Sequence, residues 1–152
     1  MVCERLQDVT YSTGVPFIPL ILDGKYLRAG PIVVPGGDTC WSCWMRRFLQ
    51  HDSWREQRKA VWNYYDENPN IGPQGYLDAT ALIGAALLSN FIDQLDTGFP
   101  IGGQIRELDL LSREIMSRTV TGVHGCPRCG LHRPEETRSF ADMQAALKHL
   151  WK

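Results

Sequence analysis

Two Cys-x-x-Cys sequences stand out in this chain: Cys40-Trp41-Ser42-Cys43 and Cys126-Pro127-Arg128-Cys129-Gly130. Each pair can supply two thiolates from a compact turn, and Zn²⁺ prefers four tetrahedral ligands with Zn–S bonds of about 2.3 Å. Because more than half of the chain separates the pairs, they must meet through tertiary folding. The spacing therefore predicts one structural zinc site that joins distant parts of one domain, with the ligands Cys40, Cys43, Cys126 and Cys129.

Other interpretations of the cysteines stay open. A lone Cys-x-x-Cys is also typical of thioredoxin-like redox dithiols, so either pair could carry redox chemistry. His124 and His132 flank the second pair and could replace a thiolate, although surface histidines on a loop are the commoner case. Cys3 stands apart, and its simplest role is that of a small, partly buried hydrophobic residue.

The composition indicates a globular domain and excludes several classes of protein. The chain has 152 residues, 43% of them hydrophobic and 22% charged, which argues against a disordered chain. The formal net charge is -1, from 16 Lys and Arg against 17 Asp and Glu, whereas nucleic-acid binders are usually basic. No apolar run is long enough to cross a bilayer, and the N-terminus lacks the pattern of a secretion signal. We therefore expect a cytoplasmic protein with no membrane partner.

Apolar periodicity and turn residues predict strands mixed with long helices, an α/β or α+β fold. The segment 76–95 is apolar on nearly every side, which predicts burial on several sides. The region from Trp44 to Asp66 is helical in pattern, with a break near His51-Asp52. Extended segments are expected at 17–22, 26–29, 32–34, 104–110 and 115–121, and an amphipathic helix is expected at 139–151 within a C-terminal segment 134–152.

The sequence lacks a self-sufficient active site. It contains none of the glycine-rich phosphate loops, the G-x-S-x-G elbow or the H-E-x-x-H pair, so we predict no catalytic residue. Asp93 and Asp96 could pair as carboxylates, but a solvated helix end is commoner. The turn 36–39 could hold an anion, although a turn into the first cysteine pair explains it equally well. The aromatic and basic stretch 44–66 could bind single-stranded nucleic acid; a helix with inward aromatics and solvated arginines is favoured.

Several segments in chain order are similar to the second half of the ThiF/MoeB/HesA superfamily, which has the ubiquitin-activating-enzyme-like adenylating fold. The resemblance covers most of residues 10–133, and its strongest element is the paired Cys-x-x-Cys. The matching segments are Gly14-Val15-Pro16-Phe17, Gly30-Pro31-Ile32-Val33-Val34-Pro35-Gly36, Cys40 with Cys43, 72–95, Leu108-Asp109-Leu110 and Cys126-Pro127-Arg128-Cys129-Gly130.

The resemblance implies a partial, Rossmann-related α/β domain at 1–133, with a mixed sheet and helices stapled by the four-cysteine zinc. The basic segment with Arg46 and Arg47 is most similar to the branch that accompanies YcaO-type cyclodehydratases in making thiazole/oxazole-modified peptides. In this family the nucleotide loop, the catalytic Asp, the adenylation Arg and the peptide-recognition winged helix lie in the first half. None of these has a counterpart here, so only the zinc ligands carry over.

Three functions follow as expectations. The first is a non-catalytic scaffold or partner subunit in peptide modification, beside an N-terminal ThiF-like half, a YcaO-like enzyme or a leader-binding protein, and in contact with a precursor peptide. The second is half of an adenylating enzyme completed in trans, with ATP bound only if another chain supplies the nucleotide loop. The third is a zinc-stapled nucleic-acid-binding module. A half-fold would leave a sheet edge and an apolar surface for a partner to cover.

Overall fold

The computed structural model describes residues 2–68, 70–71, 76–98 and 101–132. The amphipathic helix expected at 139–151, and with it the segment 134–152, lies outside the described residues. The division of the chain at residue 133 therefore stays a prediction.

Four strands form an antiparallel sheet in the order β1-β2-β3-β4. The hairpin that the Asp23-Gly24 signal predicts is confirmed, with Gly24 and Lys25 as its two turn residues between the first two strands. The mixed sheet that we expected is wrong for the described strands, because all three pairings are antiparallel. Short links enforce this direction for β1–β2 and β3–β4, whereas β2 and β3 pair across the long connection formed by residues 30–103. The strands are β1 (Leu20–Asp23), β2 (Tyr26–Ala29), β3 (Gln104–Asp109) and β4 (Ile115–Thr119).

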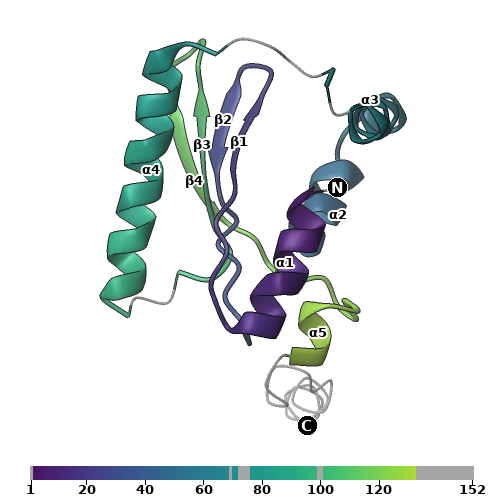
Figure 1. Ribbon diagram of the computed structural model, residues 1–152, viewed down its shortest axis with the longest axis vertical. Coiled ribbons are helices and arrows are strands. Elements are labelled where there is room, and N and C mark those ends of the chain that lie inside the picture. The colour runs from purple at the N-terminus through teal and green to yellow at the C-terminus, as the bar shows by residue number, and fades with distance from the viewer. Residues whose placement is uncertain (1, 69, 72–75, 99–100, 133–152) are drawn as a thin grey trace, which may run out of the picture.

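One face of the sheet is covered by the helix α4 (Asp78–Asp96), as Figure 1 shows. Gly84 lies directly against the side chain of Leu20, and Phe91 is fully buried in a cluster with Ala29, Ile32 and Ile101. Burial of α4 on several sides, which its composition predicted, is wrong for this chain alone. Its buried residues are Thr80, Gly84 and Phe91, so its outer face is exposed.

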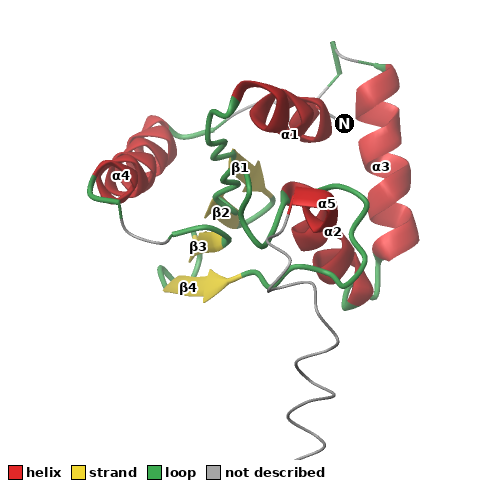
Figure 2. Ribbon diagram, turned by 90° about the horizontal axis from the view of Figure 1, so that it is seen from below, coloured by secondary structure: helices red, strands yellow, loops and turns green. Residues whose placement is uncertain are grey.

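The other helices lie on the far side of the sheet from α4 (Figure 2). The sequence did not indicate α1, because its buried residues are the polar Gln7 and Thr10, which give no apolar stripe. Gln7 exchanges hydrogen bonds with Ser42 and so ties α1 to α2. These helices are α1 (Val2–Thr13), α2 (Trp41–Gln50), α3 (Arg55–Glu67) and α5 (Cys129–His132).

The helical region expected between Trp44 and Asp66 is confirmed, together with its break. α2 already begins at Trp41, so the first cysteine pair sits in its opening turn, and the helix ends at Gln50. α3 is then anchored by Arg58, which donates to Asp52 in the break and to Asp23 at the hairpin. The guanidinium group of Arg58 thus links α3 to the break and to the β1–β2 hairpin.

A close backbone crossing follows β2. The amide of Gly30 donates to the carbonyl of Pro19, and the amide of Ile32 donates to the carbonyl of Gln104. A Cβ on Gly30 would lie 2.4 Å from that same Gln104 oxygen, and Gly30 has φ of +99°. Both the space and the backbone conformation therefore require glycine.

We predict that Gly30→Ala lowers the free energy of unfolding by about 3 kcal/mol or more, because backbone strain adds to a clash with main chain. Gly36→Ala is the matched control: Gly36 also has positive φ, but nothing lies within 4 Å of its added Cβ. It should cost about 1 kcal/mol. Urea unfolding measures the free energy of unfolding of both variants. Equal losses of stability would contradict the backbone crossing as the reason for the effect of Gly30→Ala.

We also predict that Asp52 stays ionised in mild acid. The hydrogen bond from Arg58 lowers the pKa of this carboxyl, and the Trp54 amide adds to the effect. The pair therefore stabilises the fold above the unfolded pKa of about 3.9, and this stability is lost as pH falls through the lower folded pKa.

In a carboxyl NMR titration from neutral pH to about pH 4.5, the wild-type Asp52 signal should stay flat, while Arg58→Gln should let protonation begin. Arg55→Gln is the control, since Arg55 pairs with Glu56. A flat Asp52 signal in Arg58→Gln would contradict the assignment.

Candidate metal centre

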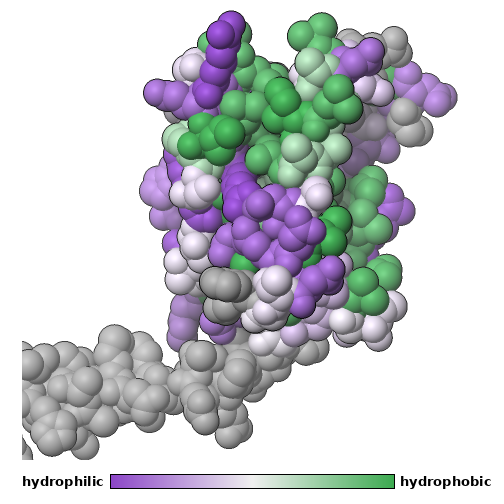
Figure 3. Space-filling view, turned by 90° about the vertical axis from the view of Figure 1, so that its left-hand side faces the viewer, coloured by the Kyte–Doolittle hydropathy of each residue, from purple (hydrophilic) through white to green (hydrophobic). Residues whose placement is uncertain are grey.

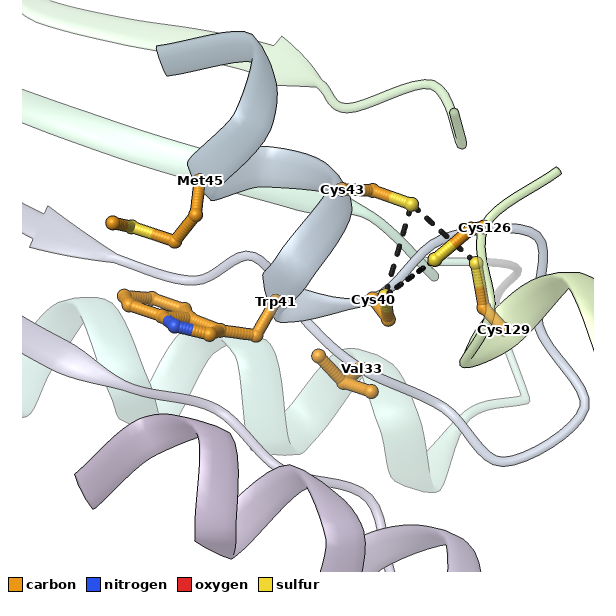
Figure 4. Packing of buried hydrophobic residues seen from close by; sticks show 7 residues of the cluster. All are labelled: Val33, Cys40, Trp41, Cys43, Met45, Cys126 and Cys129. Carbon is orange, nitrogen blue, oxygen red and sulfur yellow. Dashed lines mark hydrogen bonds between the residues drawn. The ribbon is translucent and has the colours of Figure 1, made fainter. Parts of the chain in front are cut away.

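The predicted zinc ligands converge on one buried point. Cys40 immediately precedes α2 and Cys43 lies in its first turn, whereas Cys126 lies in the loop before α5 and Cys129 begins α5. Their sulfur atoms point toward one another in Figure 4. All four are at most 2% exposed, so the site is shielded from water.

The spacing of the sulfur atoms fits a tetrahedral ion. Cys40 Sγ lies 3.7 Å from the sulfurs of both Cys43 and Cys126, and Cys43 Sγ lies 3.4 Å from that of Cys129. All four ligand atoms lie within 4.8 Å of one another. Four thiolates around one ion at about 2.3 Å would stand about 3.8 Å apart, whereas a disulfide requires about 2.05 Å. The four thiols could therefore hold a metal ion.

The surroundings favour a thiolate at Cys43. Hydrogen bonds from the Cys129 and Cys40 thiols lower the pKa of Cys43 far below that of an ordinary thiol, and the amide of Val123 donates to the same sulfur over 3.2 Å. The pKa of Cys40 is raised to about 11, because the neighbouring Cys43 and burial outweigh a lowering hydrogen bond from Cys129. The Cys43 thiolate therefore already has the deprotonated form that a metal ligand must have.

The cluster is packed as a structural site. Val33, Trp41 and Met45 surround it on one side (Figure 4), and Tyr11 packs against it from α1. Burial, followed by the charge of the thiolates, raises the pKa of Tyr11, which keeps its phenol neutral. Four protein ligands in an apolar shell leave no open coordination position, the arrangement of structural rather than catalytic metal sites.

The other predicted ligands stand apart from this cluster. His124 is exposed, and the metal-holding group found among the described residues consists of the four cysteines. The side chain of His132 is outside what the structure describes. Cys3 is half-buried and packs against the cluster, in keeping with its predicted role as a small hydrophobic residue. A cluster of four thiols favours metal binding over a two-thiol redox pair.

The possible carboxylate pair on α4 and the possible anion-binding turn at 36–39 both have structural explanations. Asp93 and Asp96 are both exposed near the end of α4, as expected for a solvated helix terminus. In the turn at 36–39, the amide of Gly37 donates to the carbonyl of Val34, and Thr39 is buried just before Cys40. This turn therefore serves as the entry to α2.

The aromatic and basic stretch forms helices with most aromatics turned inward. Trp44 stacks on Phe48 at 5.2 Å between ring centroids, and Phe48 stacks on Trp62 at 6.5 Å. Arg55 and Lys59 both pair with Glu56. The rings face one another, which weakens the nucleic-acid interpretation, since base stacking needs accessible rings.

The structure also contains a cleft that the sequence did not predict, and none of the four cysteines lines it. Its volume is about 850 Å³, and it lies between α2 and the sheet face that points away from α4. Arg28 is 4% exposed there and pairs with Asp23 and Glu107. The alternation of charged and apolar residues in β3 hinted at a polar face. However, only strand register brings Arg28 opposite Glu107.

None of the helices within the described ranges combines the length and apolarity that crossing a membrane requires.

Comparisons with solved structures find the same fold. The heterocyclase TruD matches with a TM-score of 0.54 and 19% identity, over 84% of this chain and 20% of that chain. E. coli MccB solved with ATP matches with a TM-score of 0.57 and 15% identity, over 84% of this chain and 35% of that chain. E. coli MccB solved with selenomethionine MccA matches with a TM-score of 0.56 and 14% identity, over 84% of this chain and 35% of that chain. No family model matches the sequence, and neither does any curated protein.

At these identities the likeness shows the fold alone, and it supports the ThiF-like fold that the sequence resemblance implies. The chain spans about a fifth of the length of TruD and about a third of that of MccB.

We predict that the chain binds one divalent metal ion and that removing it destabilises the fold severely. Structural zinc supplies on the order of 10 kcal/mol in small metal-dependent domains. Elemental analysis should find one ion per chain, and a strong chelator should lower Tm.

Cys129→Ser should abolish the metal and reproduce the effect of chelation, because one sulfur ligand is lost. Cys3→Ser is the control: it removes a thiol outside the cluster and should leave the metal content unchanged. An unchanged Tm after chelation would contradict a structural ion.

Proposed function

We propose that this chain is a zinc-containing, ThiF-like subunit that acts as a scaffold or partner in the biosynthesis of a ribosomally made, post-translationally modified peptide. One observation carries the proposal: a four-thiol cluster on a fold shared with a heterocyclase and with MccB, which was solved together with MccA. Azoline-type cyclodehydration by a YcaO-like partner, or a related modification, is the reaction class that this proposal implies.

The metal in this proposal is structural Zn²⁺ held by Cys40, Cys43, Cys126 and Cys129. A set of four thiolates with tetrahedral spacing is the donor set that zinc prefers. Its role would be to hold α2 against α5, since the two pairs are far apart in the chain. Reduced cysteines are expected in the cytoplasm, where we place the protein.

A second protein chain is part of the proposal. The outer face of α4 supports this part. Leu82 is 72% exposed and Ile92 52%, and Figure 3 shows apolar side chains gathered on the upper part of this side. An apolar helix face of this kind favours a protein partner.

A second candidate function is half of an adenylating enzyme completed in trans. The match to MccB solved with ATP favours it. It differs from the scaffold in one measurable respect: pyrophosphate exchange should appear when this chain is mixed with a nucleotide-binding partner chain. The scaffold predicts no exchange in that mixture. In both cases the isolated chain should bind no ATP.

We predict that the tagged chain, purified from its own host, carries one zinc ion and a second polypeptide, because its α4 face needs cover. Native mass spectrometry measures both masses together. Leu82→Glu should release the partner without lowering Tm, since this side chain is exposed in the lone chain.

Val61→Glu is the matched control, because Val61 is an exposed apolar residue on α3, away from α4 in Figure 1. It should keep the partner. A zinc-loaded chain that purifies alone would refute the subunit role.

A further inference from the structure

We propose that the cleft between α2 and the sheet binds an extended, acidic segment of a peptide. The peptide's identity as a modification substrate rests on the proposed function, but the cleft's preference for carboxylates rests on its own residues. The lining holds five cationic side chains against three carboxylates, and one of the cations, Lys25, pairs with Asp109 outside the lining. The whole chain has a net charge of -1, so this positive excess is local. The cations are Lys25, Arg28, Arg47, Arg58 and Arg118, and the carboxylates are Asp23, Asp52 and Glu107.

The carboxylates of the cleft are already engaged by the inner cations. Arg28 pairs with Asp23 and Glu107, and Arg58 pairs with Asp52 and Asp23. Each carboxylate of the lining is therefore already paired with an arginine. An incoming cation would compete with Arg28 and Arg58 for these carboxylates, whereas an incoming anion would not displace a pair.

Two arginines at the β4 side are not neutralised in this way. Arg47 donates to the carbonyls of Thr121 and Gly122, and Arg118 contacts the sulfur of Met116. Both side chains are exposed, and within the described residues neither forms a salt bridge. Guanidinium groups of this kind bind carboxylates through paired N–H donors. The unmatched charge therefore lies where ligand can reach it.

The position of β4 at the edge of the sheet suits binding of an extended peptide. In the described sheet β4 pairs only with β3, so its outer backbone groups can pair with an added strand. Register places Arg118 beside Ile105 and Met116 beside Glu107, on the cleft face. A peptide strand along β4 would thus present alternate side chains to the arginines, while Trp44 and Phe48 offer an apolar wall.

The lining also argues against a nucleotide. Phosphate sites use runs of backbone N–H groups from glycine-rich loops or helix N-termini. Gly24, in the hairpin turn, is the one glycine of this lining, and α2 contributes its later residues from Trp44 onward. The available donors are therefore side-chain guanidinium groups beside an unpaired strand edge, which suits a peptide with Asp or Glu at alternate positions.

Fluorescence anisotropy on the metal-loaded chain tests the proposal. The probes are a labelled peptide that alternates Glu with Val and the same peptide with Gln in place of Glu. We expect the Glu peptide to bind more tightly and its binding to weaken as salt is added, because the contacts are ionic. Arg118→Gln should weaken it about fivefold, the effect of losing one partly exposed ion pair.

Arg46→Gln is the matched control. Arg46 is exposed on the same helix as Arg47 but does not line the cleft, so its loss should leave the affinity unchanged. Because Arg118 and Arg46 are both exposed, neither variant should lower Tm. Equal binding of the Glu and Gln peptides, or equal losses in the two variants, would overturn the proposal. Displacement of the Glu peptide by a single-stranded oligonucleotide at equal concentration would also overturn it and assign the cleft to phosphates.

The failure of this inference can be told apart from the failure of the proposed function. If no partner chain copurifies but Arg118→Gln still weakens binding of the Glu peptide selectively, the cleft assignment stands without the subunit role. If the partner copurifies and Arg118→Gln leaves peptide binding unchanged, the subunit role stands and the cleft assignment fails.

Discussion

The convergence of four sulfur atoms is the constraint on which the rest of this structure depends. It joins the start of α2 to the start of α5, and so it fixes the relative positions of these two helices. The backbone crossing at Gly30 and the apolar shell with Trp41 both lie along the connection between the sheet and the first cysteine pair. The cysteine cluster and the packing of α1, α2 and α5 around it are therefore one structural unit.

Sequence reasoning succeeded where chemistry is local. Cysteine spacing identified the cluster, Asp23-Gly24 the hairpin, and His51-Asp52 the break between helices. It failed where burial has no apolar signature, as in α1 with its buried Gln7 and Thr10. It also failed for α4, whose apolar surface predicted burial that the chain alone does not provide. The cleft could not be predicted from the sequence, because its charged residues come together only through the register of the strands.

The charge pattern of the two sheet faces separates two roles. The face under α4 is mainly apolar, with Leu27 and Ala29 buried, and Arg106 on the same face contacts Phe91 and Asn90 of the helix. The opposite face carries Asp23, Arg28 and Glu107, whose pairing keeps charges partly buried without leaving any of them unmatched. Such paired charges add little net stability, but they fix the relative positions of the side chains. Losing one partner would leave the other as an uncompensated, partly buried charge. One sheet thus offers a packing surface and a polar surface back to back.

The long separation between the two cysteine pairs sets the order of events during synthesis. Cys40 and Cys126 are 86 positions apart, so at roughly 5 to 20 residues per second the ribosome makes the second pair about 4 to 17 seconds after the first. During that interval the first pair is an open dithiol with no tetrahedral site to complete. The four-cysteine cluster therefore cannot assemble until Cys129 has been made, whereas the β1–β2 hairpin and α4 both precede that residue in the chain.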